Sequence, residues 1–183
     1  MRFRLRKATR DDHDRVDAAF AIFDLSTPAG LTAYLRAHHA ALCALEPHFS
    51  ACPGVPALTP RLPLIQRDLA VLGASALPSP PSRTFHGSPL GQAYVFAGSH
   101  LGGKILNAQR MQSQSREVQR AGAYMGAEDM ASFWDNVLER IAAEGEGEDA
   151  FEAMLLGARD GFQLFIEAIA YVRSEDGRRR AEW

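Results

Sequence analysis

Apolar residues recur at steps of three and four along most of this 183-residue chain, in segments separated by proline, glycine and acidic residues. This spacing places the apolar side chains on one face of an α-helix. The composition agrees, because 30 alanines and 19 leucines stand against 18 valines, isoleucines and threonines together. Alanine and leucine favour helices, whereas β-branched residues favour strands. We therefore predict an all-α fold, a single-domain helical bundle.

The proline, glycine and capping residues between the apolar segments predict where the helices begin and end. The expected helices cover residues 3–20, 28–45, 61–72, 90–111, 116–124, 128–143 and 150–173. Thr27 is a capping residue and Pro28 suits a first helical position, whereas Pro47 is expected to end the same helix. Residues 73–89, with four prolines, are expected as a surface loop. The domain is expected over 1–175, with 176–183 as a frayed basic tail.

Charge, hydropathy and missing motifs narrow the function. With 20 basic and 22 acidic residues the net charge is −2, so we expect no nucleic-acid partner. We expect no membrane span and no leader, hence a cytoplasmic protein. Cys43 and Cys52 are too few for a disulfide framework and match no zinc pattern. Hydrolase, phosphate-loop, dinucleotide and di-iron carboxylate motifs are missing, which disfavours those enzyme classes.

The segment Gly98-Ser99-His100-Leu101-Gly102-Gly103 is unusual inside an expected helix. Each interior glycine costs about 1 kcal/mol relative to alanine, so three cost roughly 3 kcal/mol. Gly98 and Gly102 are four residues apart and expose bare backbone on one face. Such a face accepts a flat ligand or a second helix at close range, and it allows a bend. The motif alone leaves both interpretations open.

His13 falls on the apolar face of the first expected helix. A lone histidine on such a face is more often a core residue than a ligand. A neutral imidazole is also an axial ligand of haem iron, provided that one ring nitrogen is free and a neighbour orients the other. Asp17, one turn on, and Thr9, one turn back, are the candidates for that orienting contact. His38 is expected as a core or pocket-lining residue.

Two segments together resemble a known family. Leu5-Arg6-Lys7-Ala8-Thr9-Arg10-Asp11-Asp12-His13, followed by Val16-Asp17, resembles the proximal helix of haem oxygenases. The glycine segment resembles their distal helix, and the order and separation of the two segments match. The all-α pattern extends over essentially the whole chain, and the resemblance is closest to the bacterial biliverdin-producing branch. It implies a bundle of the haem oxygenase type, with His13 as the iron ligand.

The resemblance also implies roles for further residues. The distal helix would lie over the other haem face with Gly98, Ser99, Gly102 and Gly103. Arg6 and Arg159 match basic positions near the haem propionates, and guanidinium groups bind carboxylates bidentately. Haem would be substrate and cofactor, cleaved with dioxygen and reductant to biliverdin, carbon monoxide and ferrous iron. A ferredoxin, flavodoxin or reductase would donate the electrons, and a bilin-binding photoreceptor is a candidate recipient of the product.

Two positions depart from the family pattern. Many members carry Asp where this chain has Ser99, and bacterial relatives often carry Glu where it has Ala97. A serine donates and accepts hydrogen bonds but holds no negative charge, so proton delivery would rely on Ser99, water or another group such as His100. Two alternatives therefore stay open: a non-catalytic haem or bilin carrier or sensor, and a ligand-free interaction module. A thiaminase- or pyrroloquinoline-type enzyme on the same architecture fits less well, because such enzymes lack the sequence context found around His13.

Overall fold

Helices make up the regular structure of this chain, which we describe from a computed structural model. The described residues are 1–50, 52–78, 83–144 and 147–181, without the side chains of 100, 101, 176 and 179–181. They form α1 (Arg2–Ala8), α2 (Arg10–Phe20), α3 (Pro28–Ser50), α4 (Arg61–Val71), α5 (Pro89–Met111), α6 (Arg116–Arg120), α7 (Met130–Ala143) and α8 (Glu148–Ala181). No strand occurs among these residues, and the predicted all-α bundle is confirmed.

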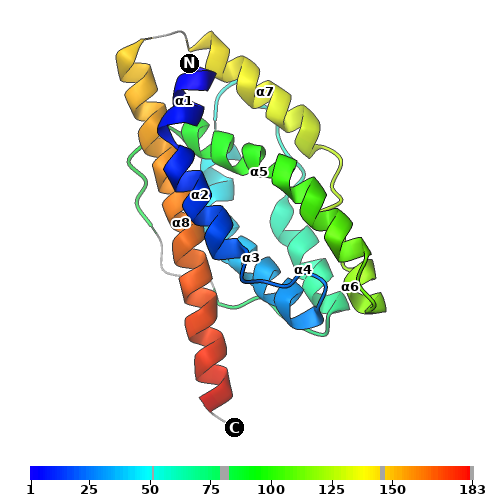
Figure 1. The fold of residues 1–183 in the computed structure, drawn as a ribbon. Helices are drawn as coiled ribbons and strands as arrows, with labels where there is room; N and C mark the ends of the chain where they lie inside the picture. The colour runs from blue at the N-terminus through cyan, green and yellow to red at the C-terminus, as the bar shows by residue number, and fades with distance from the viewer. Residues whose placement is uncertain (51, 79–82, 145–146, 182–183) are drawn as a thin grey trace.

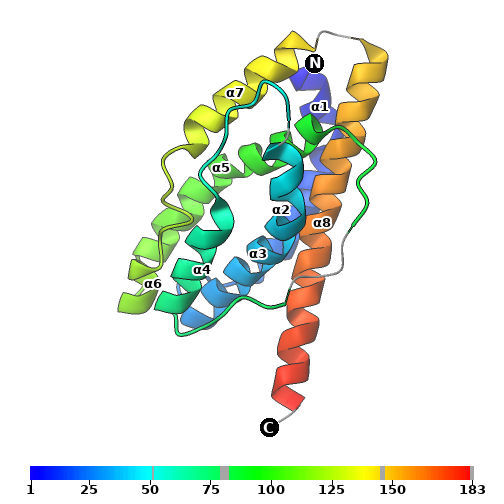
Figure 2. The same cartoon turned by 180° about the vertical axis from the view of Figure 1, so that it is seen from behind.

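The long helix α8 supports much of the bundle. It packs against α5, α3, α2 and α1, and α5 packs in turn against α7 and α3. In Figure 1 the α1–α2 pair lies in front, beside α8, and α5 crosses the molecule diagonally toward α6. The view from behind shows α3 and α4 in front of the other helices (Figure 2). Both views show α5 changing direction partway along, and the C-terminal part of α8 extending beyond the other helices.

The core lies where α3, α5, α7 and α8 meet. Its centre holds Phe49, Phe96 and Phe133, all buried. The rings of Phe49 and Phe96 are stacked, with centroids 4.9 Å apart and 10° between their planes. Stacked aromatic pairs add to the free energy gained from burying their area. This contact fixes α3 against the first half of α5.

The first expected helix is two helices, divided at Thr9. The Thr9 hydroxyl donates to the carbonyl oxygen of Leu5 at 2.9 Å, and its φ of −107° departs from helical geometry. A side chain that bonds to the backbone in this way competes with continuation of the helix. None of the residues of α2 is buried. On the expected apolar face, Val16 and Phe20 are half-buried against the core, whereas the side chain of His13 is exposed.

The second expected helix begins as predicted and ends later. The amide of Gly30 donates to the Thr27 hydroxyl at 3.1 Å, which confirms the cap before Pro28. The helix α3 then continues through Pro47 to Ser50. A proline removes one helical hydrogen bond, and here the burial of Phe49 against Phe96 compensates for it in the last turn. The prediction that Pro47 ends this helix was wrong.

Two further helices have bounds that differ from the prediction. The helix α6 stops at Arg120 instead of residue 124, because the Asp68 carboxylate accepts hydrogen bonds from the amides of Ala123 and Tyr124, both at 2.8 Å. The helix α8 continues to Ala181 rather than ending near Arg173. Residues 79–82 of the expected loop and 182–183 of the expected tail lie outside the described residues. None of the described helices has the length and hydropathy of a membrane-spanning segment.

Candidate functional site

The imidazole of His13 stands exposed on α2. Its side chain is 57% exposed, and Nδ1 lies 3.2 Å from a carboxylate oxygen of Asp17, one turn further along. The ring meets the edge of Phe162 on α8, with centroids 6.1 Å apart. The Asp17 contact orients the ring through Nδ1 and leaves Nε2 as the nitrogen for a ligand. The expected alternative, Thr9, bonds to Leu5 instead.

Arg159 of α8 contacts the helix that carries His13. Its Nε is 3.7 Å from a carboxylate oxygen of Asp12, the residue before His13, and its side chain is 56% exposed. Asp12 also pairs with Arg15 on the same helix. The pair between Arg159 and Asp12 connects α8 to α2 at the edge of the bundle. The arginine of this pair is exposed, whereas the Asp12 side chain is 16% exposed and retains Arg15 as a second partner, so Arg159 can turn to another carboxylate at small cost.

Arg6 has different neighbours. It is exposed on α1, and its positive charge acts on Tyr94 of α5. Burial raises the pKa of Tyr94, and the guanidinium groups of Arg2 and Arg6 oppose that rise. Tyr94 precedes Gly98 by one helical turn. The charge of Arg6 thus acts on α5 one turn before the glycine segment, whereas Arg159 contacts the residue that precedes His13.

The glycine segment lies within the continuous helix α5. A Cβ added to Gly98 would meet the Trp134 ring of α7 at 3.6 Å, which is an ordinary contact distance. A Cβ added to Gly102 or Gly103 would meet no described atom within 4 Å. Close helix–helix packing within the described chain therefore does not account for Gly102 and Gly103. These two glycines leave an open backbone surface on α5.

Ser99 is bonded to its own helix. Its hydroxyl donates to the carbonyl oxygen of Phe96 at 2.6 Å, although the residue is exposed. In this rotamer the hydroxyl proton is already engaged, and only the oxygen lone pairs face outward. The side chain of His100 lies outside the described part of the chain.

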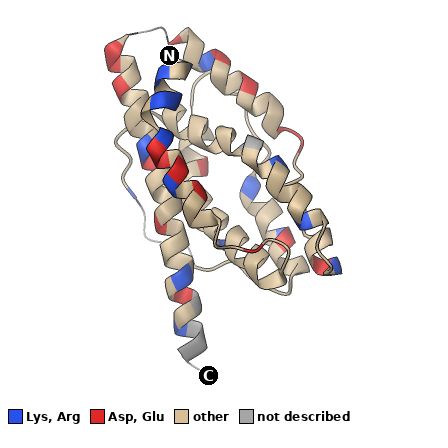
Figure 3. Ribbon diagram, viewed as in Figure 1, with Lys and Arg blue, Asp and Glu red and all other residues tan. Residues whose placement is uncertain are grey.

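The helix α8 holds the two expected parts of the site. A Cβ added to Gly161 would touch Val95 of α5 at 3.4 Å, and the next residue, Phe162, meets His13 of α2. Neighbouring residues of α8 thus contact the helix with His13 and the helix with the glycines. Figure 3 shows a contrast between these helices: acidic and basic residues crowd α2, whereas α5 has few charges.

Tyr94 and Trp134 form an aromatic wall beside Gly98 that was not predicted from the sequence. The rings of Tyr94 and Trp134 have centroids 5.7 Å apart, and the Arg2 guanidinium lies 5.7 Å from the Trp134 ring centroid. These residues come from α5, α7 and α1. Their spacing along the chain carries no signal for this contact, because it depends on how three helices pack. Trp134 is only partly buried and lies against Gly98, at the start of the glycine segment.

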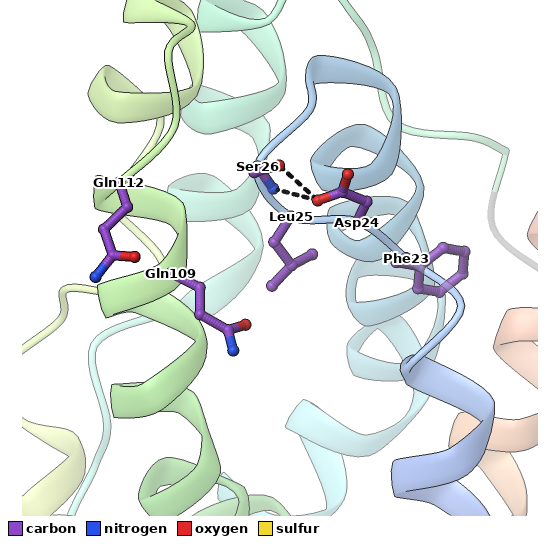
Figure 4. A pocket seen from close by; sticks show the side chains of 6 residues that line it. All are labelled: Phe23, Asp24, Leu25, Ser26, Gln109 and Gln112. Carbon is purple, nitrogen blue, oxygen red and sulfur yellow. Dashed lines mark hydrogen bonds between the residues drawn. The ribbon is translucent and has the colours of Figure 1, made fainter.

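A hollow of about 380 Å³ lies beyond the glycines, between the α2–α3 loop and the end of α5. It is lined by Phe23, Asp24, Leu25, Ser26, Gln109 and Gln112. Figure 4 shows Leu25 and Gln109 directed into the space between the loop and α5. Hydrogen bonds from Ser26 lower the pKa of Asp24. None of the predicted site residues lines this hollow.

His38 is a core residue, which was one of the two roles predicted for it from the sequence. It is buried among the rings of Phe20, Tyr34, Tyr124 and Phe165. The Tyr124 hydroxyl lies 2.7 Å from its Nδ1. Burial lowers the pKa of His38 to about 3, so the ring is neutral at neutral pH. This contact fixes Tyr124 against α3.

No group of three or more His, Cys, Asp or Glu in the described part of the chain is placed to hold a metal ion. A haem iron needs one axial imidazole from the protein, and His13 is the exposed histidine whose ring is oriented by a carboxylate one turn away. No protein-family model and no curated protein matches this chain.

Proposed function

We propose that this chain is a haem oxygenase, which cleaves haem with dioxygen and reductant to biliverdin, carbon monoxide and ferrous iron. The observation that carries the proposal is the exposed His13 imidazole, held through Nδ1 by Asp17 with Nε2 left for a metal. A histidine of the core would be buried, as His38 is. The resemblance of the His13 and glycine segments to the two haem-contacting helices of the family supports the same function.

The residues present fit haem on chemical grounds. A neutral imidazole oriented by a carboxylate is a good iron ligand. The backbone of Gly102 and Gly103 has no described atom within 4 Å of an added Cβ, so a flat ring can approach it closely. Arg159 and Arg6 are exposed cations that suit the two propionates. The aromatic ring of Trp134 adds an apolar wall beside Gly98.

Haem, when bound, supplies the iron that accepts electrons and dioxygen. The chain binds and orients it. His13 would ligate the iron through Nε2, and Asp17 would keep the ring in one tautomer and orientation. Arg159 would exchange Asp12 for a propionate. The glycines would keep bulky side chains away from the distal face, where Ser99 or water would supply protons. An external ferredoxin, flavodoxin or reductase would provide the electrons.

A second function, haem or bilin binding without turnover, is favoured by one observation. The Ser99 proton is committed to the Phe96 carbonyl oxygen at 2.6 Å. A hydroxyl bonded in this way donates to a ligand only after it breaks that bond. If no other group delivers protons, the chain holds haem as a carrier or sensor.

The test is a haemin titration followed by absorbance, with wild type, His13→Ala and a matched control, His48→Ala. His48 is also exposed but lies at the end of α3. We expect a one-to-one Soret band in wild type and His48→Ala, lost or shifted in His13→Ala. Ascorbate or a ferredoxin system in air should then convert the Soret band to a biliverdin band.

The outcomes separate the functions. A one-to-one complex that depends on His13 but never decays under reductant and air would support the carrier or sensor over the oxygenase. A Soret band that is unchanged in His13→Ala would remove His13 as the ligand. If haemin gives no complex with wild type, both haem functions are wrong, and the ligand-free interaction module is the alternative that is left.

A further inference from the structure

The hollow between the α2–α3 loop and the end of α5 brings together polar side chains that have hydrogen-bonding capacity left over. Its volume of about 380 Å³ falls within the range of small-molecule sites, roughly 300–1,000 Å³. One carboxylate oxygen of Asp24 accepts from the amide and the hydroxyl of Ser26, and the other accepts from no described residue. The side-chain amides of Gln109 and Gln112 likewise bond to no described residue. These groups take no part in the haem function proposed above, and they are available to a ligand.

The electrostatic surroundings of this hollow favour a cation. Hydrogen bonds from Ser26 lower the pKa of Asp24, so the carboxylate is charged at neutral pH. The described residues that line the hollow include no lysine or arginine. The helix α2 ends at Phe20 and α5 ends at Met111, so the C-termini of two helices lie close along the chain to the lining residues. A helix C-terminus has a partial negative charge, which adds to the charge of Asp24.

The positive groups nearest along the chain are already engaged elsewhere. Arg110, in the last turn of α5, is 3% exposed and donates to two backbone carbonyl oxygens of α6. The N-terminus of α3 follows the loop, but Pro28 has no amide hydrogen, and the Thr27 hydroxyl accepts from the Gly30 amide at 3.1 Å. These groups therefore do not neutralise the negative charge of Asp24 in the hollow.

The loop that carries Asp24 is fixed before a ligand arrives. The carbonyl oxygen of Asp24 accepts from the Thr27 amide at 3.1 Å and from the Thr27 hydroxyl at 2.9 Å. The Ser26 carbonyl oxygen accepts from the Ser113 hydroxyl, which ties the loop to the residues just after α5. Leu25 is 5% exposed and belongs to the core. A ligand therefore binds here without the entropic cost of ordering the loop.

We propose that this hollow binds a small organic cation with an apolar body, of the class of aromatic amidines and amines. The N–H groups of the cation donate to the unpaired carboxylate oxygen of Asp24 and to the side-chain oxygen of Gln109 or Gln112. The apolar body contacts Phe23 and Leu25, which line the same space (Figure 4). A metal ion fits less well, because a hard cation needs several oxygen ligands and the hollow supplies one carboxylate.

The test compares benzamidine, an aromatic cation, with benzamide, a neutral molecule of nearly the same shape. Each is titrated at neutral pH into the isotope-labelled protein without haem, so the result does not depend on the haem function. We expect benzamidine to shift the backbone amide NMR signals of residues 23–26 and 109–112 until they saturate. Benzamide should bind at least about tenfold more weakly, because it cannot form a charge-assisted hydrogen bond with Asp24.

The role of Asp24 is tested by Asp24→Asn, which removes the charge and keeps an oxygen that accepts the hydrogen bonds from Ser26. The affinity for benzamidine should fall about tenfold. Asp14→Asn is the matched control, because Asp14 is exposed on α2 and does not line the hollow, and its affinity should equal that of the wild type. Circular dichroism checks the folding of both variants.

Three results would overturn the proposal. The first is equal affinity of the wild type for benzamide and benzamidine, which would show that charge plays no part. The second is an unchanged affinity for benzamidine in folded Asp24→Asn. The third is the lack of saturable shifts at residues 23–26 and 109–112, with any shifts spread instead over the acidic residues of α2.

Discussion

The two halves of α5 have opposite environments within one helix. Residues 90–97 are buried at every position, whereas the described side chains of 98–111 are exposed or half-buried, with Arg110 as the exception. Glycines occur in both halves for different reasons. A Cβ on Gly91 would come within 2.1 Å of the Met154 carbonyl oxygen, whereas one on Gly102 would meet no described atom. The first half is bundle core, and the second half leaves the backbone of Gly102 and Gly103 uncovered by the described residues.

The largest loss of stability should come from a substitution in the buried first half of α5. Phe96→Ala removes a ring that is 1% exposed and stacked on Phe49, so the free energy of unfolding should fall by about 3–5 kcal/mol. Ile105→Ala, on the same helix at 66% exposure, should change it by less than about 0.5 kcal/mol. Urea denaturation followed by circular dichroism measures both. Similar losses in the two variants would break the comparison.

The glycines should respond with opposite signs. Gly91→Ala forces a methyl group against the α8 backbone and should cost about 2 kcal/mol. Gly102→Ala meets no described atom and gains helix propensity, so it should stabilise the ligand-free protein by about 0.5–1 kcal/mol. Thermal unfolding gives the two signs. A destabilised Gly102→Ala variant would show that this part of α5 is covered after all.

A smaller change in stability, one that depends on pH, should distinguish the buried His38 from the exposed His13. Burial lowers the pKa of His38 from 6.5 to about 3, so the fold favours its neutral form. Its contribution to stability is complete above pH 6.5 and is lost progressively as the pH falls toward 3. Between pH 7 and 5.5 the loss should be about 1 kcal/mol.

Urea denaturation at the two pH values tests this dependence on protonation. The loss should become smaller in His38→Leu, in which His39, whose pKa burial also lowers, is still present, and it should persist in full in His13→Ala. If His38→Leu keeps the full pH dependence of the wild type, His38 is not its source.

Local signals were enough for several features of the fold and the site. The Thr27 cap and Pro28 start lie next to each other in the chain, and the contact between His13 and Asp17 follows from their one-turn spacing. Features that depend on distant residues were not predictable in this way. Pro47 is tolerated within α3 because Phe49 stacks on Phe96, a residue of α5 that is distant in the sequence. Trp134, which packs against Gly98, likewise belongs to a different helix. The exposure of the Gly102 backbone likewise depends on the packing of the other helices, none of which places a described atom within 4 Å of an added Cβ.

The helix that carries His13 has no buried residue and packs mainly along α8. The free energy needed to open α2 locally and expose its backbone amides is therefore lower than that needed to open the core helices. In hydrogen exchange, the amides of α2 should lose protection before those of α3 or the first half of α5. A molecule bound through His13 would slow exchange in α2 first, so this helix reports occupancy of the site even when the rest of the bundle is unchanged.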